Sequence, residues 1–126
     1  MSKILSVNGN KAMNFLLKTV FEGEFTFIPV ADAFQAIYEM KHSGKIGALI
    51  VDVDFQPQQS WELVQHIKSS KLLNIPVVIL ASENSDELKL KSYEYEVDEI
   101  FFKPFNPVDL ITAVRNLEAS EVMTDA

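Results

Sequence analysis

The sequence contains no cysteine, and glycine is scarce, with four glycines among its 126 residues. The lack of cysteine excludes a disulfide framework, thiol chemistry and thiolate metal ligands. With so few glycines there is no glycine-rich phosphate-binding loop, which argues against a nucleotide-binding enzyme. No apolar run approaches the roughly 18 residues that a membrane-spanning helix needs. We therefore expect a protein of a reducing compartment with no membrane association.

Basic residues are outnumbered as well, because 11 Lys and Arg against 18 Asp and Glu give a net charge of −7. Binding to a phosphate backbone requires clustered cations, and no predicted helix carries a basic stripe, so direct nucleic-acid binding is not expected. The first residues lead directly into a strand pattern without a secretory signal, which predicts a cytoplasmic protein. The length fits one domain, predicted over residues 1–119, followed by a polar C-terminal tail over residues 120–126.

Apolar residues follow two alternating periods along the chain. Short runs rich in β-branched and aromatic residues predict five buried strands, at Ile4–Val7, Phe25–Val30, Ala48–Val51, Val77–Leu80 and Ile100–Phe102. Segments with helical spacing separate them. Asp32, Ser60 and Ser85 are the predicted caps of the second, third and fourth helices, and Pro107 opens the fifth. This strict alternation predicts a parallel sheet with helices on both faces.

Two single charges stand directly after strands of this pattern. Asp52 follows the third strand and Lys103 follows the fifth. The carboxyl ends of parallel strands meet at one edge of the sheet, where ligands collect. The sequence therefore predicts that this carboxylate and this ammonium form one site.

With these elements in place, the chain resembles the receiver domains of two-component response regulators over nearly its whole length. Asp52 stands where that family has its phosphoacceptor aspartate, and Lys103-Pro104-Phe105 reproduces the family's lysine, proline and aromatic residue. The resemblance implies a flavodoxin-like (βα)5 fold with strand order 2-1-3-4-5. It also implies that a histidine kinase or phosphotransfer protein phosphorylates Asp52, and that Lys103 pairs with the phosphoryl group.

Four positions depart from the family's pattern. Asn8 and Gly9 replace two adjacent acids that hold a divalent ion, Ala81 replaces a threonine or serine, and Ile100 replaces an aromatic residue. In the family, the hydroxyl moves toward the phosphoryl group and the aromatic ring fills the space it leaves. The resemblance therefore implies a damaged switch. Ser82 adjoins Ala81, but continued strand alternation predicts that it faces away from the site.

Magnesium is expected to bind weakly. This ion keeps several waters and binds proteins through one or two carboxylates, so the loss of both family acids leaves Asp52 as a poor holder. Lys103 further reduces the negative potential there. Asp54, two residues beyond Asp52, is the candidate second ligand, and its alternative is a solvated loop carboxylate.

Two functions remain open at this point, and neither is that of an enzyme. The first is a receiver-like domain in a phosphorelay with Asp52 as phosphoacceptor. The second is a pseudo-receiver, a protein-binding module that works without phosphorylation. The acidic and aromatic stretch Tyr93–Glu96 is either a partner-binding surface or a solvated helix end. The resemblance also implies a candidate homodimer through the fourth helix, fifth strand and fifth helix, while the protein target is not identified.

Overall fold

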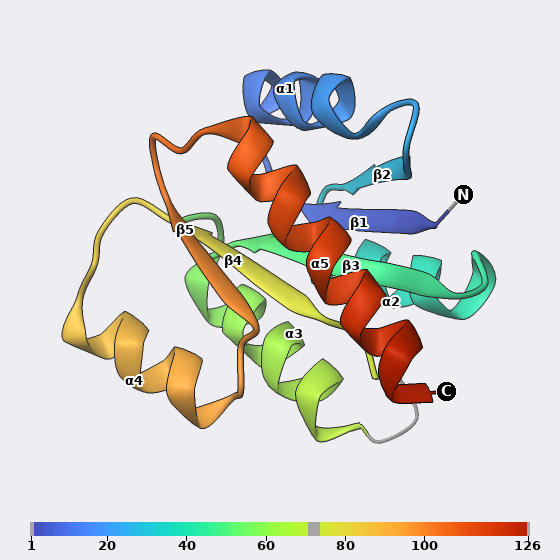
Figure 1. Cartoon of the computed structure of the whole chain (residues 1–126). Coiled ribbons are helices and arrows are strands. Elements are labelled where there is room, and N and C mark those ends of the chain that lie inside the picture. Colours follow the sequence, from blue (N-terminus) through green and yellow to red (C-terminus); the bar gives the residue numbers. More distant parts are fainter. Residues whose placement is uncertain (1, 71–73, 126) are drawn as a thin grey trace.

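Strands and helices alternate throughout the computed structural model, which describes residues 2–70 and 74–125 (Figure 1). Within these ranges the elements are β1 (Lys3–Val7), α1 (Lys11–Phe21), β2 (Thr26–Val30), α2 (Ala33–His42), β3 (Ile46–Asp52), α3 (Pro57–Ser69), β4 (Val77–Ala81), α4 (Asp86–Glu94), β5 (Glu99–Phe102) and α5 (Pro107–Asp125). All neighbouring strands are parallel, and their order is β2-β1-β3-β4-β5. The predicted fold class and strand order are confirmed.

The sheet separates two apolar layers. Leu49 and Val51 of β3 belong to the layer under α2, α3 and α4, whereas Ala48 and Ile50 belong to the layer under α1 and α5. Successive side chains of a strand point to opposite faces, so β3 serves both layers. Figure 1 shows α5 crossing one face of the sheet, with α3 beyond the other. This double cover explains why the strands read as continuous apolar runs.

Strand register brings the ends of β3, β4 and β5 to the same edge. Asp52, the last residue of β3, lies beside Leu80, and Ala81, the last residue of β4, lies beside Phe102. Lys103 follows Phe102, and its backbone N–H donates to the carbonyl of Ala81 at 2.9 Å. The charged residues after β3 and β5 therefore project from one edge, as the sequence predicted.

Helix boundaries agree with the sequence at two caps and differ at a third. Asp32 Oδ1 accepts from the N–H of Gln35 at 2.9 Å, and Ser85 caps α4. The prediction for Ser60 was wrong, because α3 starts at Pro57 and Ser60 is buried inside the helix. Proline is favoured at the first helical position because its missing N–H and fixed φ suit that place.

The last helix is longer than predicted. α5 continues to Asp125, across most of the segment expected to be a tail from residue 120. No glycine or proline follows Pro107, and Leu, Glu, Ala and Met favour helices, so nothing in the sequence ends α5 early. Residue 126 lies outside the described residues. No helix in the described ranges combines the length and apolar character needed to cross a membrane.

β1 begins and α5 ends at the amino edge of the sheet, opposite the charged edge. The backbone carbonyl of Ser2 accepts from the N–H of Thr26 at 2.8 Å, which extends the first strand pair at its start. The Ser2 hydroxyl donates to the carboxylate of Glu118 on α5. Figure 1 shows both chain ends on the same side of the molecule.

Candidate functional site

Asp52 and Lys103 form a direct ion pair at the carboxyl edge. Lys103 Nζ donates to Asp52 Oδ2 at 2.7 Å, and Asp52 Oδ1 accepts from the backbone N–H of Asp54 at 3.0 Å. Asp52 is 3% exposed, so both oxygens of this buried carboxylate have partners. The pair joins the ends of two strands that lie on either side of β4. The predicted meeting of these two side chains is confirmed.

Asp54 belongs to the same cluster and does not stand alone in solvent. Its Oδ2 accepts from Lys103 Nζ at 3.1 Å and from the hydroxyl of Ser82 at 2.5 Å. The prediction that Ser82 faces away was wrong. β4 ends at Ala81, so strand alternation does not continue to Ser82, and its side chain can turn toward the site.

These contacts shift two pKa values in the site. Partial burial alone would lower the pKa of Lys103, but hydrogen bonds to Asp52 and Asp54 outweigh it, so this pKa lies above its usual value. Partial burial works against the charged form of Asp54, but hydrogen bonds from Ser82 and Lys103 outweigh it, so its pKa is lowered. Lys103 is thus held as an ammonium beside the ionised carboxylate of Asp54 at neutral pH.

Gly9 lies directly against Phe55. A Cβ atom on Gly9 would stand 2.4–2.8 Å from three carbons of the Phe55 ring, closer than such atoms approach in proteins. The ring therefore occupies the space in which an acidic side chain at position 9 would begin. Phe55 follows Asp52 by three residues, and its N–H donates to the carbonyl of Asp52 at 3.2 Å. The loop after β3 thus carries an aromatic ring to the end of β1.

Asn8 is engaged in the turn that starts α1. This residue is 2% exposed, and its Oδ1 accepts from the N–H of Asn10 at 2.8 Å. Its backbone carbonyl accepts from Nδ2 of Asn14 at 3.2 Å. The remaining polar atom, Nδ2, is a hydrogen-bond donor and cannot ligate a cation. Asn8 therefore shapes the turn and offers no free side-chain oxygen to a metal.

The residues present do not fit the two-acid magnesium site implied by the resemblance. Gly9 supplies no carboxylate, and the Oδ2 oxygens of Asp52 and Asp54 both hold Lys103. Among residues 2–70 and 74–125, no three His, Cys, Asp or Glu side chains gather as a metal-binding group. A divalent ion at this site would have to compete with the Lys103 ammonium for the Oδ2 oxygens of Asp52 and Asp54.

The two remaining departures sit in the layer beneath α3 and α4. Ala81 is 2% exposed and contributes no hydroxyl. Ile100 is partly buried, lies beside Ile79 in the sheet and packs against the same apolar layer. Its side chain is part of the core packing. The sequence located both positions correctly on their strands.

Sequence reasoning missed two members of this site, Phe55 and Ser82. For Ser82 the signal was available, because a polar Ser-Glu-Asn-Ser run follows the apolar strand and marks its end. For Phe55 the signal was a large aromatic residue in the short loop after the third strand, together with the small Gly9 after the first. Only the fold shows that these two lie in contact.

Comparison with known proteins agrees with this architecture. The family model described as response regulator receiver domain matches residues 4–115. The chain is 28% identical to the transcriptional regulatory protein YvrH of Bacillus subtilis over 116 residues, which cover 90% of this chain and 48% of YvrH. It is also 28% identical to the CpxR homolog of Haemophilus influenzae, covering 91% of this chain and 49% of that protein. The chain thus spans about half the length of these curated relatives.

Solved structures with the same fold include the Francisella response regulator 1452 receiver domain, with a TM-score of 0.83 and 22% identity over 96% of this chain and 99% of that one. A response regulator from Thermotoga maritima gives a TM-score of 0.82 and 20% identity over 94% of this chain and 98% of that one. Fold, strand order and family match therefore agree, and the chain belongs to the receiver domain family of response regulators in two-component signalling.

Proposed function

We propose that this receiver domain accepts a phosphoryl group on Asp52 and that Lys103 supplies the main positive charge for the reaction. One observation carries the proposal, the 2.7 Å contact between Asp52 Oδ2 and Lys103 Nζ at the carboxyl edge of the sheet. The donor would be a histidine kinase or phosphotransfer protein. An Asp52 oxygen attacks phosphorus, the phosphorus–nitrogen bond to the donor's histidine breaks, and the imidazole leaves with its electron pair.

Lys103 matches the electrostatic demand of this step. Phosphoryl transfer spreads negative charge over the equatorial oxygens, and a fixed cation beside them lowers the barrier. Hydrogen bonds to two carboxylates raise the pKa of Lys103 despite its partial burial, so the ammonium persists well above neutral pH. Any contribution from Mg²⁺ is expected to be weak, because no carboxylate stands at Gly9.

Asp54 is proposed to restrain the reaction. Its carboxylate shares Lys103 with Asp52 at 3.1 Å and would repel an incoming phosphoryl group. Asp54→Asn should therefore speed phosphorylation. If Asp54 instead held a metal ion, the same substitution would slow the reaction and weaken its dependence on Mg²⁺.

The downstream partner is proposed to be a protein. Leu90 and Tyr93 on α4 and Val108 on α5 are large exposed apolar side chains, with 66%, 86% and 64% exposure. They support self-association or target binding through α4, β5 and α5. The named relatives are transcriptional regulators, and this chain spans only about half of each.

Intact mass after incubation with acetyl phosphate, with and without Mg²⁺, tests the proposal. The wild type should gain the mass of one phosphoryl group, and Asp52→Asn should gain none. A phosphorylated phosphotransfer protein should serve as a second donor. If neither donor modifies the wild type, the alternative pseudo-receiver function, which needs no phosphorylation, is favoured. A gain that persists in Asp52→Asn would place the modification elsewhere.

A further inference from the structure

A groove of about 680 Å³ lies between α3 and α4, beside the site just described. Its apolar lining includes the buried side chains of Val53, Trp61, Ala81 and Leu88, with Tyr95 at one end. The rings of Trp61 and Tyr95 lie 6.1 Å apart. A groove of this volume accommodates a few side chains of a partner.

The rim of the groove is strongly acidic. Four exposed carboxylates line it, those of Asp54, Glu62, Glu83 and Glu87, against Lys91 as the one cation among the described lining residues. Rim charges of one sign select partners of the opposite sign. The charge pattern therefore favours a basic occupant, while the apolar lining favours one that also carries apolar groups.

Lys91 shows how a cation is accommodated here. Its ammonium lies 5.6 Å from the centroid of the Trp61 ring and 3.0 Å from Glu87 Oε1. Cations over an indole face are attracted by the ring's negative π-surface. Lys91 lies one turn of α4 beyond Glu87. This lysine therefore contacts both the Trp61 ring and a carboxylate of the acidic rim.

We propose that the groove between α3 and α4 binds a basic segment of a partner protein, with an arginine over Trp61 in place of Lys91. A guanidinium is planar, stacks on aromatic faces and forms forked hydrogen bonds to carboxylates, so it suits Trp61 with Glu62 and Glu87 better than an ammonium does. Neighbouring apolar residues of the segment would contact Leu88 and Tyr95. This binding does not require phosphorylation of Asp52.

The single tryptophan of the chain makes the test direct, because Trp61 is the only indole that can report. The probe is the synthetic peptide acetyl-Ala-Leu-Arg-Arg-Leu-Ala-amide, titrated to millimolar concentration against the full chain. Indole fluorescence and the Trp61 indole N–H resonance should both change and saturate. The peptide with glutamate in place of arginine should produce no change.

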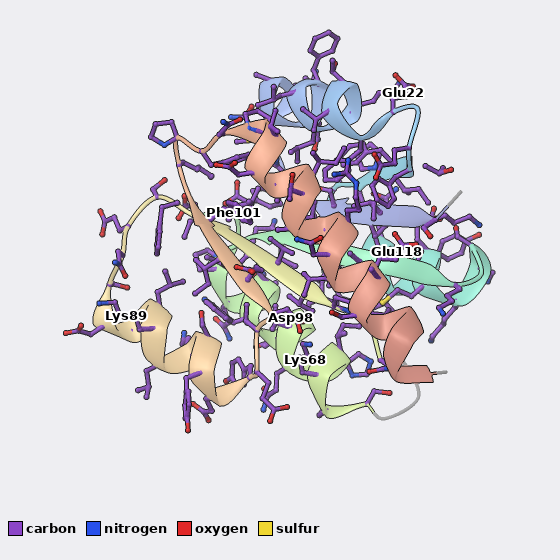
Figure 2. The ribbon with its side chains drawn as sticks, viewed as in Figure 1. Glu22, Lys68, Lys89, Asp98, Phe101 and Glu118 are labelled. Carbon is purple, nitrogen blue, oxygen red and sulfur yellow. The ribbon has the colours of Figure 1, made fainter. Side chains whose placement is uncertain are left out.

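Variants separate this groove from general charge attraction. Glu62→Lys combined with Glu83→Lys should weaken binding about tenfold, whereas Glu22→Lys, at the end of α1 and away from α4 in Figure 2, should alter it less than about twofold. Lys91→Ala should strengthen binding about threefold, because it removes the competing cation. Damage to the fold would not strengthen binding.

Three results would overturn the proposal. The Trp61 signals could stay unchanged at millimolar peptide, or Glu22→Lys could weaken binding as much as the groove variants do. Spermidine, which carries charge but no side chain that can stack on a ring, could also bind as tightly as the peptide. If spermidine bound as tightly, charge alone would account for the binding, and a docking site for a protein segment would be excluded.

Discussion

Gly9 and Phe55 depend on each other, because the phenyl ring lies where a side chain at position 9 would begin. A side chain at position 9 is therefore incompatible with the present position of the Phe55 ring in the loop after β3. Restoring the acid alone would place a carboxylate against an aromatic ring. The two positions must be considered as a pair when the missing metal ligand is rebuilt.

Mg²⁺ binding should be restored only by changing both residues. Gly9→Asp alone should leave Mg²⁺ affinity unchanged and destabilise the fold by about 1–3 kcal/mol, the usual cost of overpacking. Gly9→Asp with Phe55→Ala should place two carboxylates near the ion and bind Mg²⁺ measurably tighter than the wild type. Isothermal titration calorimetry gives the affinities, and urea unfolding gives the stabilities.

Phe55→Ala alone is the matched control for that experiment. It opens the space beside Gly9 without adding a carboxylate, so its Mg²⁺ affinity should equal that of the wild type. Tight Mg²⁺ binding by Gly9→Asp alone would contradict the coupling, since it would mean that the ring moves aside at little cost.

The connection from the site to α4 lacks the hydroxyl and the aromatic ring that the resemblance to receiver domains implies. Ala81 has no hydroxyl to follow a phosphoryl group, and Ile100 is held in the packing under α3 and α4. A ligand shifts a conformational equilibrium only through contacts that differ between the two states. Lys103, which directly follows β5, is the contact that we expect to differ between the two states.

A phosphoryl mimic such as beryllium fluoride should therefore produce local changes. Amide chemical-shift changes should concentrate in residues 52–57, 81–84 and 103–105, and remain small over α4 and the first turns of α5. Ala81→Thr, which adds the missing hydroxyl, should extend them toward α4. Large changes across Leu88–Tyr95 in the unmodified chain would demonstrate another coupling route.

The order and limits of the elements followed largely from the sequence. Each predicted strand overlaps the observed one, because strands buried on both faces must be apolar throughout, and this pattern is visible without a structure. The start of α3 was predicted too late because serine is a preferred N-cap residue. The helix instead begins at Pro57, three residues before Ser60. The end of α5 was predicted too early because the polar residues from position 120 onward were interpreted as a tail.

The site could be predicted only in part. Asp52 and Lys103 could be paired because both follow strands whose ends must meet at one edge. The contacts of Asp54 with Ser82 and of Gly9 with Phe55 depend on how loops fold beyond the strands. Local patterns can mark where a strand ends, as the polar run from Ser82 does, but they do not predict these contacts, because packing between distant segments sets the conformation of the loops.

For the whole molecule, the charged cluster should shape the pH dependence of stability. The raised pKa of Lys103 means that its contribution is complete below its ordinary pKa of 10.5 and disappears as pH rises through the higher folded value. The lowered pKa of Asp54 means that its contribution is complete above its ordinary pKa of 3.8 and disappears as pH falls through the lower folded value.

Lys103→Met should remove the contribution of Lys103 and reduce that of Asp54, whose hydrogen bond from Ser82 remains. At neutral pH it should destabilise the fold by about 3 kcal/mol, because the buried Asp52 carboxylate loses its partner. The difference in the free energy of unfolding between this variant and the wild type should become smaller at strongly acidic and strongly alkaline pH. Urea unfolding across the pH range measures this, and Asp52→Asn combined with Lys103→Met should recover much of the loss. A difference that stays constant with pH would show that the cost arises from packing and not from charge.

The start of β1 and the helix α5 lie together at the amino edge of the sheet, where Ser2 is hydrogen-bonded to Glu118, and this position has a practical consequence for handling the molecule. Because β1 starts and α5 ends on the edge opposite Asp52, a tether attached beside either of them orients the molecule with the edge that carries Asp52 outward. Immobilised on a sensor chip through such a tether, the domain would leave that edge and the neighbouring groove accessible to a partner in solution. The same geometry would allow a fluorescent protein to be fused beyond α5 without shielding the site.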